Sequence, residues 1–193
     1  MLHPFLRSKT DDQHQQLEKV FLDLLQGVKT QVEYEILLKK MAGFLVPLEK
    51  QLTQFPLQHI VPDIAERQRM HHLLTDIAVF DPDWQPLNSV KLPELTSIYQ
   101  AIGTLYVLEG ATLGGPIIAR MIKQQAGIEK GLHYFESYGP ERKTMWAKFR
   151  DYLEIPGLYQ HKEIIASSAI ACFRAYKQWL ELTSSIQYDA TSN

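Results

Sequence analysis

The chain has 193 residues, of which 45% are hydrophobic and 22% charged, and its formal net charge is −2. This size and balance are typical of one globular domain that can bury a core and a pocket. A net charge near zero gives no indication of the strongly basic face that nucleic-acid binding requires. The single cysteine, Cys172, excludes an intramolecular disulfide and is compatible with a reducing compartment. We find neither a secretory leader at the start nor an apolar run near the ~20 residues of a membrane span, so we expect a cytoplasmic protein.

Apolar residues recur at helical spacing along most of the chain. In chain order, the pattern predicts helices over residues 4–25, 31–55, 63–79, 94–126, 141–154 and 159–182. We expect Leu74 to face inward on the third of these helices and Ile164 to be buried on the last.

The remaining segments favour loops. Proline and glycine are frequent in 81–93 and 127–140, and both residues interrupt helices. No stretch alternates apolar and polar residues as a half-buried strand would. The sequence therefore predicts an all-α fold, a single-domain multi-helix bundle over 1–183 with a flexible tail over 184–193.

The first predicted helix contains LRSKTDDQHQQLE, which places Arg7, His14 and Glu18 on one stripe of its surface. A neutral imidazole is a good axial ligand for haem iron, and an arginine two turns away could pair with a carboxylate of the same ligand. A single histidine on a helix is weak evidence. Six further histidines compete for the role: His3, His59, His71, His72, His133 and His161.

The fourth predicted helix is interrupted in its centre by LEGATLGGPII, which contains Gly110, Gly114, Gly115 and Pro116. Each glycine costs ~1 kcal/mol relative to alanine in a helix interior, and proline costs ~3 kcal/mol. Such destabilisation favours a compensating role, either close helix packing or close approach of a flat ligand to the backbone. Gly110 and Gly114 lie one turn apart and present one bare face.

These motifs resemble the haem oxygenase family. LYVLEGATLGG is similar to the family's distal helix, and LR..T...H..LE to its proximal-histidine helix. RQRMHHLLTDI, YFESYGPERKTMWAKFRDYLE and AIACFRAYKQWLE resemble the third helix, the segment after the distal helix and the last core helix. The resemblance covers roughly residues 5–182 in the expected order. It is strongest to the bacterial branch associated with bacteriophytochromes and implies a haem oxygenase-like bundle with a glycine-kinked distal helix.

The resemblance also implies roles for individual residues. His14 would be the proximal iron ligand, and Gly110 and Gly114 would have a catalytic role by steering oxygen on the haem. The residues implied to contact haem are His14, Arg7, Tyr106, Gly110, Gly114, Gly115 and Phe173. A second propionate contact would come from Lys143, Lys148 or Arg150, and the sequence leaves the choice open.

The implied activity is cleavage of haem to biliverdin, Fe²⁺ and CO. Haem would be cofactor and substrate, O2 the oxidant, and a protein or small reductant the external electron donor; we expect a monomer. One position departs from the family pattern. Mammalian-type members carry an aspartate after the first distal glycine, whereas this chain has Ala111, so the route of proton delivery is left open.

Three alternatives compete with this interpretation. A haem carrier or sensor of the same fold would bind haem without turning it over. A non-haem di-iron oxidase would need several inward carboxylates and histidines, for which Asp11 with His14, and His72 with Asp76, are the available pairs, Glu109 being the carboxylate on the glycine helix. A plain helical interaction module would use the glycines only for packing.

Overall fold

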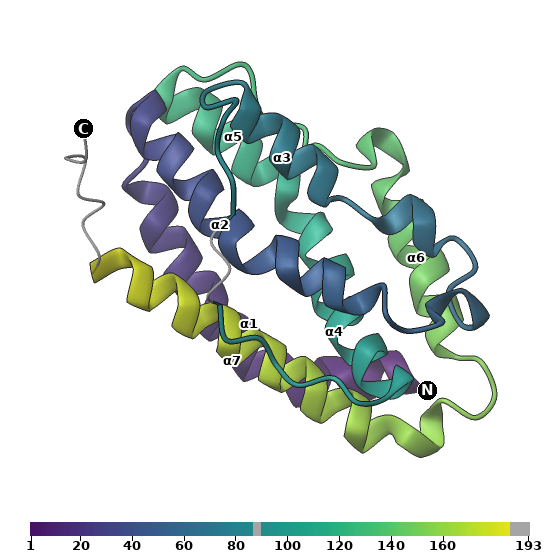
Figure 1. Ribbon diagram of the computed structural model, residues 1–193. Coiled ribbons are helices and arrows are strands. Elements are labelled where there is room, and N and C mark those ends of the chain that lie inside the picture. The colour runs from purple at the N-terminus through teal and green to yellow at the C-terminus, as the bar shows by residue number, and fades with distance from the viewer. Residues whose placement is uncertain (87–89, 186–193) are drawn as a thin grey trace.

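The computed structural model describes residues 1–86 and 90–185, with side chains described as far as residue 182. Within these residues the fold is entirely helical, which confirms the predicted all-α class (Figure 1). The α-helices are α1 (Leu2–Gln26), α2 (Gln31–Leu52), α3 (Met70–Ala78), α4 (Ile98–Ala111), α5 (Gly115–Ala126), α6 (Arg142–Leu153) and α7 (Lys162–Ser185).

Helix α7 packs along both α1 and α4 (Figure 1). We call these three helices the helical layer. Gly103 lets α4 and α7 approach closely, because a Cβ there would collide with the carbonyl oxygen of Ile165. Helix α2 covers the layer and packs against α3. The core between them is made of leucine, isoleucine and aromatic side chains, among which Tyr34, Phe44 and Phe149 are fully buried.

The start of α2 follows from a capping box. The Thr30 hydroxyl accepts a hydrogen bond from the Glu33 amide at 3.3 Å, and the Glu33 carboxylate accepts one from the Thr30 amide at 2.9 Å. Each bond gives a partner to a backbone amide at the start of the helix, where no helical carbonyl is available to accept from it. The boundary predicted at residue 31 is therefore confirmed, whereas the helix ends at Leu52 rather than at 55.

The helix predicted over 63–79 is wrong in its first half. Residues Ile64–Arg67 form a short 3₁₀ helix, Gln68 is extended, and α3 begins only at Met70. The carboxylate of Glu49 accepts hydrogen bonds from the amides of Arg69 and Met70, at 2.8 and 3.0 Å. This tertiary contact from α2 caps α3 at a position that helical periodicity alone does not reveal.

The predicted interruption of the glycine helix is confirmed. Helix α4 starts at Ile98, after a Ser97 cap, instead of at 94, and ends at Ala111. A 3₁₀ turn, η3 (Thr112–Gly114), then leads into α5, whose first turn contains Pro116. Proline is tolerated there because the first amides of a helix have no partner within the helix.

Two burial predictions are wrong: Leu74 is 37% exposed and Ile164 is 45% exposed. Each lies next to a buried neighbour, Leu73 or Ile165, that takes the inward position. Helix α7 continues to Ser185, two residues into the predicted tail; the rest of that tail, 186–193, and residues 87–89 of the predicted loop lie outside the described residues.

One described stretch, Ile98–Ala126, is long and apolar enough to cross a membrane by length and composition alone. This differs from the sequence-based expectation that no run approaches that length. However, 61% of its apolar window is buried inside the fold, as is usual for a core helix, and η3 divides it.

Candidate functional site

A cavity of about 690 Å³, open to solvent on one side, lies between the helices and is the larger of two described pockets. Its size falls in the range of sites that bind small molecules and cofactors. Side chains from α1, α2 and α7 form part of its wall, and α4, η3 and the start of α5 form another part. We call the segment Gly110–Gly114, which contributes backbone to this cavity, the glycine wall.

Helix α1 contributes a regular stripe to the cavity: His3, Arg7, Thr10 and His14 all line it. Their spacing of three or four residues places them on one face. The Thr10 hydroxyl donates to the carbonyl of Leu6 at 2.8 Å, so its polar group is satisfied within the helix. The hydrogen-bonding atoms that face the cavity from this stripe are therefore mainly those of the histidines and the arginine.

The His14 imidazole contacts the ring of Phe173 on α7, edge to face, with centroids 5.7 Å apart. Phe173 is buried and lines the same cavity, while His14 is solvent accessible. The apolar ring thus restricts the imidazole from one side without using either ring nitrogen. A histidine held in this way can offer a nitrogen lone pair to a ligand in the cavity.

The three predicted glycines line the cavity but differ in what surrounds them. A Cβ on Gly110 would meet nothing closer than Trp146 at 3.9 Å, and one on Gly114 nothing closer than Ile118 at 3.9 Å. At Gly115 a Cβ would collide with the carbonyl oxygen of Phe135. Packing within the protein therefore explains Gly115 but does not explain Gly110 or Gly114, whose bare surfaces form a cradle that side chains would fill.

Aromatic rings close one end of the cavity. Tyr106 is 8% exposed, and its ring lies 6.3 Å from that of His3 and 6.0 Å from that of Trp146. His3 also meets Trp146 edge-on at 5.6 Å. Burial raises the pKa of Tyr106, so its hydroxyl stays neutral. Tyr106 lines the cavity, and its contact with haem stays a prediction.

Positive charge gathers at the same end. Arg7 and Arg150 both line the cavity, and burial together with these two guanidinium groups lowers the pKa of His3. Lys143 and Lys148, the other two cations named from the sequence, are exposed on α6 and do not line the cavity. The structure therefore brings Arg150 to the site and leaves both lysines outside it; their role as haem contacts stays a prediction.

Sequence reasoning missed several lining residues, notably His3, Arg69 and Trp146. One signal could have identified His3, which lies eleven residues before His14, three turns back on the same helix face. Arg69 and Trp146 lie in segments predicted as helices, but their position at the cavity depends on how α3 and α6 pack, which local periodicity does not encode.

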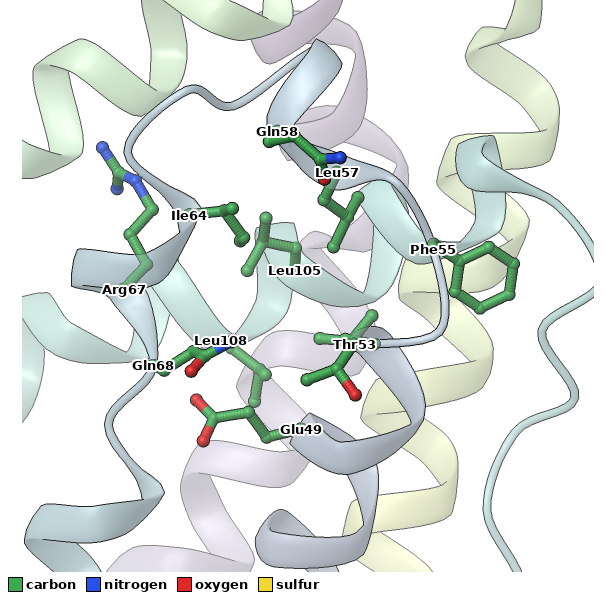
Figure 2. Close-up of a pocket in the computed structure, with 11 residues that line it drawn as sticks. Glu49, Thr53, Phe55, Leu57, Gln58, Ile64, Arg67, Gln68, Leu105 and Leu108 are labelled. Atoms are coloured by element: carbon green, nitrogen blue, oxygen red, sulfur yellow. The ribbon is translucent and has the colours of Figure 1, made fainter.

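A second, smaller cavity of about 120 Å³ lies beside α4 (Figure 2). It is lined by Glu49, Arg67 and Leu105 among others, and Leu108 borders both cavities. It is too small for a planar macrocycle.

The chemistry of the larger cavity suits a flat, metal-centred ligand. Two imidazoles, three guanidinium groups, apolar rings and the bare surfaces of Gly110 and Gly114 meet there. Within residues 1–86 and 90–182, no group of three or more histidine, cysteine, aspartate or glutamate side chains could hold a metal ion by itself. The di-iron alternative therefore lacks the ligand set it requires, because such sites need several carboxylates.

Comparisons with known proteins agree with this geometry. The haem oxygenase family model matches residues 2–182. A haem oxygenase of Xanthomonas campestris pv. campestris is 34% identical over 122 residues, which are 63% of this chain and 72% of that protein. The solved haem oxygenase of Leptospira interrogans superposes with a TM-score of 0.76 at 18% identity, over 94% of this chain and 98% of that one.

The haem oxygenase-1 of the cyanobacterium Synechocystis sp. PCC6803, solved in complex with haem, superposes with a TM-score of 0.75 at 20% identity, over 94% of this chain and 91% of that one. These two structures support the fold, the family model covers the whole helical domain, and the Xanthomonas relative supports the same family over 63% of the chain. The chain therefore belongs to the haem oxygenase family.

Proposed function

We propose that this chain cleaves haem oxidatively, with the imidazole of His14 as the axial ligand of the iron. One observation carries the proposal: His14 and the bare glycine wall line the same cavity. A neutral imidazole suits haem iron, and two positions without a Cβ atom, Gly110 and Gly114, let a flat ring approach the backbone. Neither Gly110 nor Gly114 has another explanation in the packing of the protein.

The remaining walls would orient the ligand. Arg7 and Arg150 would pair with its propionates, since guanidinium binds carboxylate through charge-assisted hydrogen bonds. Phe173 and Tyr106 would pack on its apolar faces and edge. The gathering of both arginines at one end of the cavity supports a single preferred orientation.

When bound, haem would supply the redox chemistry, by which O2 and electrons from an external donor yield biliverdin, Fe²⁺ and CO. The chain would contribute binding, orientation and exclusion of bulk water. The buried rings of Phe173 and Tyr106 form apolar parts of the cavity wall. We further propose a cytoplasmic monomer that receives electrons from a reductase or a small reductant, in keeping with its single, buried cysteine.

A haem titration of the wild type, His14→Ala and His59→Ala tests the ligand assignment. His59 is an exposed histidine outside the cavity and serves as a matched control. We expect a His-ligated ferric spectrum for the wild type and His59→Ala, and its loss in His14→Ala. Unchanged axial ligation in His14→Ala would refute the assignment.

Addition of ascorbate or a reductase to the haem complex separates the enzyme from a carrier or sensor. We expect the Soret band to disappear while a bilin spectrum and CO form in equal amounts. A Soret band that survives reduction in air would favour the carrier instead.

A further inference from the structure

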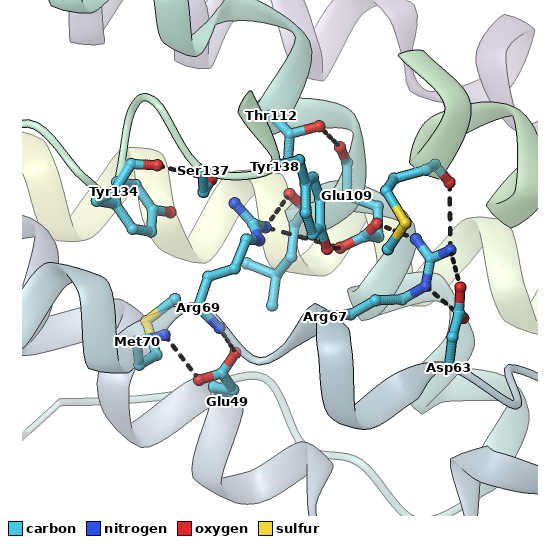
Figure 3. Close-up of polar contacts among 12 residues, drawn as sticks. Glu49, Asp63, Arg67, Arg69, Met70, Glu109, Thr112, Tyr134, Ser137 and Tyr138 are labelled. Carbon is cyan, nitrogen blue, oxygen red and sulfur yellow. Dashed lines mark hydrogen bonds and ion pairs between the residues drawn. The ribbon is translucent and has the colours of Figure 1, made fainter. Parts of the chain in front are cut away.

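A buried polar cluster lies beside α4 and joins this helix to the segments that precede α3 and α6 (Figure 3). Its centre is Glu109, which directly precedes the glycine wall, is 1% exposed and does not line the cavity. A buried carboxylate is costly unless it is paired. Here Arg67 donates to one carboxylate oxygen and the Tyr138 hydroxyl donates to the other at 3.0 Å. We call these residues, together with Asp63 and Arg69, the Glu109 cluster.

The two arginines of the cluster differ in how fully they are used. Arg67 donates two hydrogen bonds to Asp63, at 2.7 and 2.8 Å, one to Glu109, and one to the carbonyl of Met145 at 3.2 Å. Its charge is therefore neutralised on two sides by carboxylates.

Arg69, in contrast, has hydrogen-bonding capacity that the protein does not use. Its guanidinium donates a hydrogen bond from Nη2 to the carbonyl of Leu108 at 2.7 Å, whereas its buried Nε has no partner. The nearest carboxylate oxygen in an ion pair with it belongs to Glu109, at 3.8 Å. Arg69 itself lines the cavity and is 3% exposed. Arg7 and Arg150, the other lining arginines, are exposed to solvent, so their fields are screened more strongly.

The position of Arg69 is fixed from several directions. Glu49 accepts a hydrogen bond from its backbone amide. The guanidinium lies 5.6 Å from the ring centroid of Tyr138 and 5.7 Å from that of Tyr134. Burial raises the pKa of both tyrosines, so both stay neutral and add no counter-charge. A hydrogen-bond donor that is held rigidly in a site of low dielectric constant interacts strongly with a nearby negative charge, because neither the donor nor water has to reorient.

We propose that Arg69 is the positioning cation of the glycine wall, favouring an anion bound to the haem iron on that side, and that Glu109 tunes its field from behind. The inference rests on the proposed function. Ala111, the residue that follows Gly110, has no polar side chain that could interact with such an anion. The proposal therefore assigns this interaction to Arg69 and the buried Glu109. Glu109 acts only through Arg69, since it does not reach the cavity.

Binding of azide and of imidazole to the ferric haem complex tests this proposal without relying on turnover. Azide is an anion and senses the field of the wall, whereas imidazole is neutral and reports on access and iron ligation. We expect Arg69→Met to weaken azide binding about ten-fold, the loss of one hydrogen bond to a charged group, with imidazole binding unchanged. Glu109→Gln keeps the shape of the side chain and removes its charge, so azide should bind more tightly.

The opposite signs of the two effects distinguish an electrostatic role from a structural one, because disrupted packing would weaken both ligands in both variants. Arg120→Met is the matched control: it removes the same charge from an exposed position on α5 outside the cavity and should leave azide binding unchanged. If both proteins bind haem normally and the wild type and Arg69→Met bind azide with equal affinity, the inference about Arg69 is wrong and the proposed function is unaffected. A wild type that binds no haem would overturn the proposed function and the inference with it.

Discussion

The rings of His14 and Phe173 meet at 83°, with centroids 5.7 Å apart. Through this contact, α1 and α7 touch each other at the cavity. α1 and α7 pack along each other over much of their length. The well-packed ring of Phe173 therefore restricts the motion of the His14 side chain, which is otherwise solvent accessible.

Replacing Phe173 with leucine should loosen this support while keeping an apolar side chain. We expect a loss of about 1 kcal/mol in the free energy of unfolding, from the smaller buried volume. Haem affinity should fall as well, because the imidazole is less restricted. Phe149→Leu is the control: Phe149 is fully buried on α6 and does not line the cavity. Urea denaturation should show similar losses for both variants, and a haem titration should distinguish them; equal haem affinity would contradict the assigned role of Phe173.

The glycines of the kinked helix should respond in opposite ways to substitution. Gly110→Ala has room for its methyl group and gains helix propensity, up to about 1 kcal/mol, so the haem-free protein should be as stable as the wild type or more so. The same methyl group would occupy the cradle, so haem should bind more weakly. Gly115→Ala should instead lose about 2 kcal/mol of stability, because its Cβ collides with the backbone at Phe135.

Thermal unfolding and haem titration of both variants check this prediction. Reduced stability in Gly110→Ala, or a Gly115→Ala protein as stable as the wild type, would show that the two positions have been interpreted the wrong way round.

The sequence predicts the helices well, because each has an amphipathic or apolar pattern long enough to be read locally. His14 and Gly110, named from unusual motifs, both line the cavity, and their roles toward haem stay predictions. Prediction from the sequence fails where a distant residue decides the outcome. Glu49 ends the irregular segment before α3, and neither its spacing from Arg69 nor any local motif indicates that contact.

The cationic end of the cavity shows the same limit. Lys148 and Arg150 lie two residues apart on one helix, so composition treats them as equal candidates. Only the packing of α6 against the rest of the molecule points Arg150 to the cavity and Lys148 to solvent.

Asp76 anchors the segment that brings Tyr134 to the cavity. Its fully buried carboxylate accepts hydrogen bonds from the amides of His133 and Tyr134, at 3.0 and 2.8 Å, and contacts the His133 ring at 2.7 Å. Asp76→Ala would leave at least one buried donor unsatisfied, so we expect a loss of about 3 kcal/mol in the free energy of unfolding.

Asp76→Asn keeps one acceptor oxygen and should lose less stability than Asp76→Ala. Chemical denaturation orders the three proteins, and hydrogen exchange at Tyr134 should speed up in the order of lost stability. An alanine variant as stable as the wild type would show that the carboxylate does not hold this segment.

His3 should make the stability of the haem-free protein depend on pH. Burial and the charges of Arg150 and Arg7 lower its pKa in the folded state below the ordinary value of 6.5. Between that lowered pKa and 6.5 the unfolded chain binds more protons at this residue than the folded one, so its contribution to stability falls as the pH drops through this window. His3→Gln cannot take up a proton, and urea denaturation of this variant from pH 7.5 to 5 should show a smaller loss of stability on acidification than the wild type. Parallel curves for the two proteins would mean that His3 titrates alike in both states, and that Arg7 and Arg150 do not act on it across the cavity end.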